Sequence, residues 1–178
     1  SEMKALADHC VEFSAFPPGH YYTPETGFVR YYKPDWFEAD KAVEPADLAK
    51  LRQALIDATE KRLMADVPLG VLLSGGLDSS LTSSIAARLM EDSGQKLHSF
   101  SIGLDPDAPD LKAARKVADF LGTEHTDVFF TVEEGIEILE KLVWHLETYD
   151  VTSIRASTPM YFLSKVIAEK GIKVVLSG

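Results

Sequence analysis

The most informative segment of the sequence is Gly70-Val71-Leu72-Leu73-Ser74-Gly75-Gly76-Leu77-Asp78-Ser79-Ser80. An apolar run ends at Leu73, two glycines follow, and a polar segment begins immediately after them. This pattern predicts a buried strand, a sharp turn and the first turn of a helix. Backbone N–H groups at the start of such a helix, together with the helix dipole, form an anion-binding site.

The composition of this loop limits which kind of phosphate ligand it can bind. The loop is shorter than a Walker A loop and lacks the lysine that follows the last glycine there. Transfer of a γ-phosphoryl group is therefore disfavoured, and a neutral cradle suits pyrophosphate as a leaving group, with Mg²⁺ supplying the positive charge. Hydroxyl donors would come from Ser74, Ser79 and Ser80, and Asp78 is the candidate Mg²⁺ ligand. The alternative is an ordinary strand-to-helix turn in which the serines and Asp78 cap the helix.

Outward from the loop, helical and strand patterns alternate along the chain. They predict helices over residues 47–64, 78–90, 110–121 and 132–146, and strands over residues 67–73, 97–104, 126–130 and 172–176. Thr158 can cap a further helix with Pro159 at its first position. Such alternation predicts the α/β class, with a mostly parallel sheet flanked by helices. Ligands of these sheets bind at the carboxyl ends of the strands.

The first part of the chain has a different pattern. Two aromatic, β-prone runs, 16–22 and 28–32, flank the turn-forming segment Thr23-Pro24-Glu25-Thr26-Gly27. They predict a β-hairpin. Residues 38–46 are charged and small, and they are interpreted as a linker between a first region, 1–37, and the α/β region, 47–178.

Composition excludes several classes of function. The 178 residues are 46% hydrophobic, and no apolar run approaches the ~20 residues needed to span a bilayer. A net charge of −10 would be repelled by a nucleic-acid backbone, so we expect no nucleic-acid and no membrane partner. The single cysteine, Cys10, excludes an internal disulfide and fits a reducing compartment, which predicts a cytoplasmic location.

The loop resembles the pyrophosphate loop of the N-type ATP pyrophosphatases, whose fold is adenine nucleotide alpha hydrolase-like. Other stretches resemble, in order and over nearly the whole chain, the glutamine-dependent asparagine synthetase family. They are Ser1-Glu2-Met3-Lys4-Ala5-Leu6, Phe16-Pro17-Pro18-Gly19, Asp66-Val67-Pro68-Leu69-Gly70, Leu97-His98-Ser99-Phe100-Ser101-Ile102-Gly103-Leu104, and residues 147–161 from Glu147-Thr148-Tyr149-Asp150 to Thr158-Pro159-Met160-Tyr161.

The resemblance implies a reaction. ATP adenylates aspartate to β-aspartyl-AMP with release of pyrophosphate, and ammonia derived from glutamine then displaces AMP to give asparagine. ATP and Mg²⁺ are the implied cofactors, and aspartate, ATP and ammonia are the implied small-molecule substrates. Residues 1–37 would be the tail of a glutamine amidotransferase domain, and residues 47–178 the N-terminal part of the synthetase domain. A homodimer is a candidate assembly.

The resemblance also implies site residues. Those matched to ATP binding are Leu72, Ser74, Gly75, Gly76, Asp78, Ser79, Ser80, Ile102, Ser177 and Gly178. Thr152 and Arg155, expected in a loop between two helices, match positions near the aspartyl-AMP. A guanidinium is a natural partner for a carboxylate or a phosphate.

The chain departs from the family pattern at its ends. In the family an acidic Gly-Ser-Asp-Glu loop and a catalytic lysine follow the Ser-Gly pair, and the glutaminase nucleophile is an N-terminal cysteine. Here the sequence runs from Ser1 to Gly178. We therefore expect a fragment that holds no complete set of catalytic residues and is inactive alone. The alternatives are a related carboxylate-adenylating enzyme such as β-lactam synthetase, and a non-catalytic nucleotide-binding module.

Overall fold

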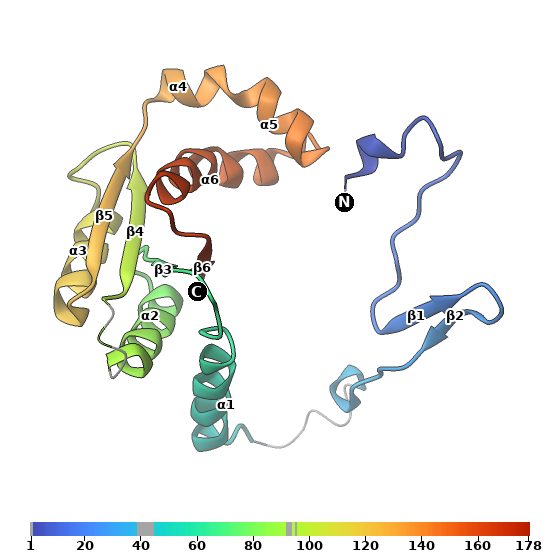
Figure 1. Ribbon diagram of the computed structural model, residues 1–178, viewed down its shortest axis with the longest axis horizontal. Helices are drawn as coiled ribbons and strands as arrows, with labels where there is room; N and C mark the ends of the chain where they lie inside the picture. Colours follow the sequence, from blue (N-terminus) through green and yellow to red (C-terminus); the bar gives the residue numbers. More distant parts are fainter. Residues whose placement is uncertain (1, 39–44, 92–93, 95) are drawn as a thin grey trace. The chain divides into compact units, whose positions relative to one another are not determined.

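The computed structural model describes residues 2–38, 45–91, 94 and 96–178 (Figure 1). The chain divides into two compact units, residues 1–51 and residues 52–178. Most of the predicted linker, residues 39–44, lies outside the described residues. Within the described residues, none of the helices combines the length and the apolar character needed to cross a membrane.

The first unit contains the predicted hairpin. Strand β1 (His20–Thr23) pairs antiparallel with β2 (Gly27–Arg30), and Tyr21 lies opposite Val29. The turn is closed by the backbone N–H of Thr26, which donates to Thr23 Oγ1 over 3.1 Å. Short 3-10 helices, η1 (Met3–Ala5) and η2 (Asp35–Phe37), lie on either side of the hairpin in sequence.

The second unit is built on a four-stranded parallel sheet, which confirms the predicted fold class. The strands are β3 (Leu69–Leu72), β4 (His98–Gly103), β5 (Glu124–Phe129) and β6 (Val174–Leu176), in the spatial order β5-β4-β3-β6. The chain moves outward from β3 to β5 and then returns to the other side of β3. The topological switch point therefore lies between β3 and β6, where ligands bind in sheets of this kind.

Helices cover both faces of the sheet. On one face, α2 (Leu77–Met90) and α3 (Pro109–Leu121) bring small side chains against the strands. Two buried clusters form there, Leu69, Val71, Ala86 and Leu97, and Leu73, Ala114 and Ala118. Helix α3 ends as predicted at Gly122, whose φ of 66° is left-handed.

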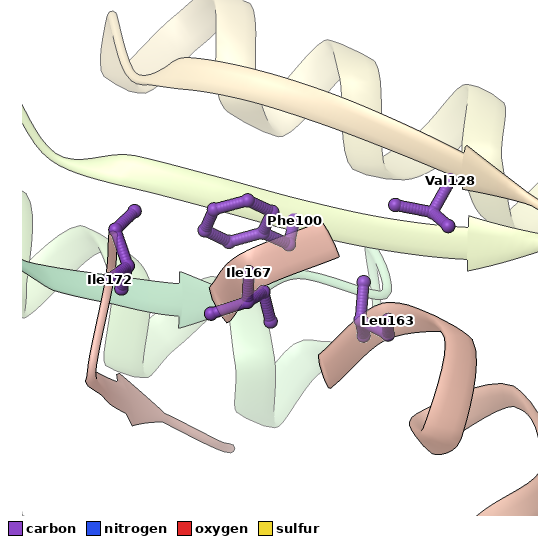
Figure 2. Packing of buried hydrophobic residues seen from close by; sticks show 5 residues of the cluster. All are labelled: Phe100, Val128, Leu163, Ile167 and Ile172. Carbon is purple, nitrogen blue, oxygen red and sulfur yellow. The ribbon is translucent and has the colours of Figure 1, made fainter. Parts of the chain in front are cut away.

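The opposite face packs against α6 (Val151–Glu169) and is apolar. Figure 2 shows the cluster of Phe100, Val128, Leu163, Ile167 and Ile172. Phe100 is fully buried, and its ring lies over Gly70 of the neighbouring strand. A Cβ at Gly70 would lie 2.9 Å from Phe100 Cε2, so the glycine leaves the room that the ring fills.

The helix predicted over residues 132–146 is two helices. Helix α4 (Val132–Glu137) begins at a capping box formed by Thr131 and Glu134. It ends at Ile138, whose ψ of −4° departs from regular helix, and α5 (Leu139–Leu146) follows. Helix α1 (Leu48–Glu60) is shorter than the predicted range 47–64.

The prediction that Thr158 caps a helix was wrong. Helix α6 begins at Val151, and its cap is Asp150, whose carboxylate accepts a hydrogen bond from the N–H of Ser153 over 2.8 Å. Thr158 and Pro159 lie inside the helix, where the Thr158 hydroxyl donates to the carbonyl of Ile154 over 2.9 Å. The expected loop around Thr152 and Arg155 is therefore the first part of α6.

Candidate nucleotide site

A pocket of about 280 Å³ opens at the carboxyl ends of β3, β4 and β6. This is the switch point of the sheet. Its lining is contributed by the three strand ends and the residues after them, the first turn of α2, the start of α3 and the middle of α6: Leu72, Leu73, Ser74, Ser79, Phe100, Ser101, Ile102, Asp110, Leu111, Met160, Leu163, Ser177 and Gly178. The arrangement joins an apolar wall to a polar loop, which is typical of small-molecule binding sites.

Six of the residues predicted for ATP binding lie together in this lining: Leu72, Ser74, Ser79, Ile102, Ser177 and Gly178. Leu72 and Ile102 come from neighbouring strands and pack with the apolar cluster beneath α6. Met160 and Leu163 of α6 complete the apolar wall.

The serine hydroxyls hold the shape of the loop. Ser74 Oγ and Ser79 Oγ are 2.9 Å apart, and the N–H of Ser74 donates to Ser79 Oγ over 3.3 Å. Ser79 Oγ also donates to the carbonyl of Gly76 over 3.3 Å. Gly76 is the N-cap of α2 and has no side chain to cap it. The N–H groups of the first turn of α2 are therefore the donors best placed for a phosphate.

The three glycines of the site have different roles. Gly75 has a left-handed φ of 76°, and a Cβ there would lie 2.6 Å from both Ala113 Cβ and the Ala114 nitrogen of α3. Gly75 is therefore needed for the close approach of α3 to the loop. Gly76 has an extended backbone, and its nearest contact for a Cβ would be Ser74 Oγ at 3.3 Å. A Cβ at Gly178 would overlap the backbone of Ser79.

The other predicted residues lie outside the lining of the pocket. Gly75, Gly76, Asp78 and Ser80 belong to the loop or the first turn of α2, and Asp78 is exposed there. Ser80 Oγ is buried and has no hydrogen-bond partner among the described residues. The described residues include no group of three or more His, Cys, Asp and Glu side chains that could hold a metal ion. Asp78 suits Mg²⁺ that binds through one carboxylate and phosphate oxygens, as this ion does at nucleotide sites.

Thr152 and Arg155 do not line the pocket. Both are exposed in the first two turns of α6. Met160 of the same helix reaches the pocket, and Arg155 lies roughly 7–8 Å before it along the helix axis. Neither residue belongs to the lining of the pocket, and their role stays a prediction.

Sequence reasoning missed several lining residues, of which Ser101, Asp110, Leu111, Met160 and Leu163 matter most. Asp110 and Leu111 begin the helix that follows β4. The rule that ligands bind at the carboxyl ends of strands could have found them. No sequence signal pointed to Met160 and Leu163, because they lie in the middle of a helix and the local pattern does not show which helical residues line a pocket.

A family model described as Asparagine synthase matches residues 50–178. Asparagine synthetase [glutamine-hydrolyzing] 2 of Oryza sativa subsp. japonica is 53% identical over 185 residues, which cover all of this chain and 31% of that protein. A probable asparagine synthetase [glutamine-hydrolyzing] of Schizosaccharomyces pombe is 55% identical over 195 residues, again covering all of this chain and 35% of that protein. The chain thus spans about a third of the length of these relatives.

Two solved structures share the fold. A glutamine-dependent NAD+ synthetase from Acinetobacter baumannii, in complex with ADP, has a TM-score of 0.52 and 18% identity and covers 89% of this chain and 30% of that chain. An NAD+ synthetase from Burkholderia pseudomallei has a TM-score of 0.50 and 20% identity and covers 83% of this chain and 61% of that chain. The match of residues 50–178 shows that the chain belongs to the asparagine synthase family.

Proposed function

We propose that this chain supplies the ATP-binding part of a glutamine-dependent asparagine synthetase. ATP adenylates the side-chain carboxylate of aspartate, pyrophosphate leaves, and ammonia released from glutamine displaces AMP. One observation carries the proposal. The phosphate loop and an apolar pocket meet at the switch point of the sheet, in a chain 53% identical along its whole length to a named asparagine synthetase.

In this proposal, the base of ATP packs between Leu72, Ile102 and Met160, and its phosphates approach the open side of Gly76. The N–H groups at the start of α2 hold the pyrophosphate as negative charge develops on it. When bound, Mg²⁺ neutralises part of that charge, and Asp78 is the residue that would hold it. Ser74 and Ser79 keep the loop in shape through their mutual hydrogen bond of 2.9 Å.

The aspartate end of the reaction is assigned to α6. Thr152 and Arg155 are exposed on its first two turns, on the same helix that brings Met160 to the pocket. A guanidinium there can pair with the carboxylate of aspartate or with the α-phosphate. We also propose a cytoplasmic location, supported by a single cysteine, and a homodimer, which light scattering of the purified protein would test.

The test is a chimera. The Oryza sativa relative, with its matching 31% replaced by this chain, would be assayed for asparagine and pyrophosphate in the presence of glutamine, aspartate and ATP. We expect both products in equal amounts. The matched variant Gly76→Val should keep glutamine hydrolysis and lose both products. A chimera that hydrolyses glutamine but releases no pyrophosphate with aspartate would contradict the proposal.

A further inference from the structure

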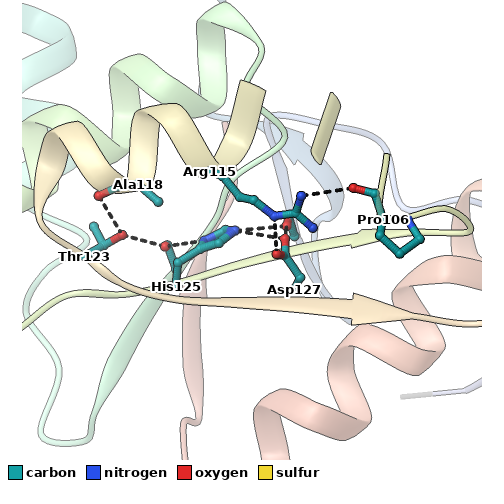
Figure 3. A network of polar contacts seen from close by, with 8 residues as sticks. Pro106, Arg115, Ala118, Thr123, His125 and Asp127 are labelled. Atoms are coloured by element: carbon teal, nitrogen blue, oxygen red, sulfur yellow. Dashed lines mark hydrogen bonds and ion pairs between the residues drawn. The ribbon is translucent and has the colours of Figure 1, made fainter. Parts of the chain in front are cut away.

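A polar network connects β4, β5 and α3 on the face of the sheet opposite α6 (Figure 3). His125 Nδ1 is 2.8 Å from Ser99 Oγ, and His125 Nε2 is 3.2 Å from Asp127 Oδ1. Ser101 donates its hydroxyl hydrogen to Asp127 Oδ1 over 2.6 Å. Since that hydrogen is used, Ser101 Oγ can only accept from His125 Nε2 at 3.1 Å.

Arg115 of α3 connects this network to a loop. Its Nε donates to Asp127 Oδ2 over 2.6 Å, and its Nη1 donates to the carbonyl of Pro106 over 3.0 Å. Pro106 belongs to the connection between β4 and α3, residues 104–108. The two elements that this connection joins both line the nucleotide pocket, β4 with Ser101 and Ile102 and α3 with Asp110 and Leu111.

The other hydrogen bonds and ion pairs that residues 104–108 make with the described part of the chain are local. The N–H of Asp107 donates to Asp105 Oδ1 over 2.8 Å, and the N–H of Ala108 donates to the carbonyl of Asp105 over 3.0 Å. Lys112 of α3 pairs with Asp107 over 2.9 Å at an exposed position. Arg115 differs because its second partner, Asp127, lies on β5 and is itself hydrogen-bonded to Ser101 of β4.

We propose that Arg115, fixed by Asp127, is a positioning residue for the nucleotide pocket. It holds the β4–α3 connection against the sheet and thereby places Asp110 and Leu111 at the wall of the pocket. The identity of the ligand rests on the proposed function, whereas the placement of the connection does not.

The chemistry of the pair favours arginine. A guanidinium presents Nε–H and Nη–H groups in a rigid fork, so it can bond Asp127 and Pro106 at once, which a single ammonium cannot do with the same geometry. Burial opposes the ionisation of Asp127. Hydrogen bonds from Ser101 and Arg115, with the electrostatic influence of the neighbouring His125 and Arg115 side chains, outweigh it and hold the pKa of Asp127 below its ordinary value.

The experiment compares Arg115→Lys with Lys112→Gln in the 178-residue chain. Lys112 is a matched control, because it is also a cation that ties α3 to the same connection, but through an exposed pair. Hydrogen exchange of the Asp107 and Ala108 amides reports the connection without nucleotide. Calorimetry with Mg-ATP reports the pocket, and the melting temperature reports global stability.

We expect Arg115→Lys to speed exchange of both amides and weaken ATP binding on the order of tenfold. Lys112→Gln should change both quantities less than about twofold, as exposed pairs contribute little. Asp127→Asn keeps the size of the side chain and should change the exchange rates and the ATP affinity as Arg115→Lys does. It replaces Arg115→Lys in the comparison if that variant fails to fold. Exchange rates and affinities in Arg115→Lys equal to those of Lys112→Gln would overturn the inference. A wild-type chain that binds no ATP would instead contradict the proposed function, and the exchange comparison would still decide the role of Arg115.

Discussion

On the α6 side of β4 and β5, Phe100 and Val128 pack against Leu163 and Ile167. On the α3 side, the same two strands present Ser99, Ser101, His125 and Asp127, joined by hydrogen bonds. The difference follows from the strand period of two, which sends successive side chains to opposite faces. One pair of strands therefore carries two contacts of different chemistry.

The apolar contact with α6 and the polar contact with α3 have different structural roles. Apolar packing is non-directional, so it stabilises the sheet without fixing the position of α6 to a single hydrogen-bond geometry. The polar contact is directional, because buried polar groups are costly unless their partners lie at the right distance. Ser99 is fully buried, and Ser101 is 4% exposed. The polar face thus fixes α3, whose first turn forms part of the pocket wall.

The largest loss of stability is expected from a substitution on the apolar face. Phe100→Ala removes a fully buried ring and leaves a cavity above Gly70. It should lower the free energy of unfolding by about 3–5 kcal/mol. Urea unfolding followed by circular dichroism measures this, with Ile102→Val as a milder control at about 0.5–1.5 kcal/mol. A loss below 1 kcal/mol for Phe100→Ala would show that the ring is not packed as described.

A smaller loss of stability is expected from a substitution on the polar face. Asp127→Asn keeps the shape of the side chain and removes its charge, which weakens the hydrogen bonds from Arg115 and Ser101. It should lower the free energy of unfolding by about 1.5–3 kcal/mol, the range for hydrogen bonds to charged groups. The same urea titration checks this. Stability equal to wild type would mean that the network contributes nothing at neutral pH.

Sequence reasoning could find what local patterns encode. The strand ending at Leu73, the glycine turn and the left-handed cap at Gly122 each depend on neighbours within a few residues. It failed where one signal fits two structures. A Thr-Pro pair suits a helix start, but here Asp150 caps the helix earlier and Pro159 is carried inside it. Long-range partners such as Arg115 and Asp127 leave no local trace, because only the packing of α3 on β5 brings them together.

A neutral hydroxyl, that of Thr123, contributes less to the polar face than the charged pair does. Thr123 Oγ1 is 2.7 Å from Ser99 Oγ, which also contacts His125, and it donates to the carbonyl of Ala118 over a long 3.5 Å. Thr123→Val removes this hydroxyl and keeps the branched shape. The expected loss of unfolding free energy is about 0.5–1.5 kcal/mol. Because Arg115 and Asp127 keep their own contacts in this variant, the exchange rates of the Asp107 and Ala108 amides should stay near the wild-type values. Accelerated exchange of these amides would contradict the assignment of the connection to Arg115 and Asp127 alone.

The smallest expected effect is the pH dependence of the stability that Asp127 contributes to the polar face. The pKa of Asp127 in the folded chain lies below its ordinary value of 3.8. Its contribution to stability is therefore present above that ordinary value and is lost as pH falls through the folded pKa. Asp150, whose pKa is lowered mainly by the hydrogen bond from the backbone of Ser153, acts in the same direction. The difference between wild type and Asp127→Asn should therefore shrink as pH falls below about 3.8, and a constant difference would contradict the ion pair.

Whether the start of α2 holds the phosphates of ATP is decided by a calorimetric titration of Mg-ATP into the wild-type chain and into Gly76→Val. Gly76 has an extended backbone that valine can adopt, and a Cβ there would meet Ser74 Oγ at 3.3 Å, a tight contact that a small movement of this hydroxyl relieves. We therefore expect the variant to fold, with a melting temperature only modestly lowered because valine is a poorer N-cap than glycine. Its side chain would stand where the phosphates approach the start of α2. We expect saturable binding by the wild type and none by Gly76→Val. Equal affinity of the two proteins for ATP would contradict a phosphate site at Gly76 and the start of α2.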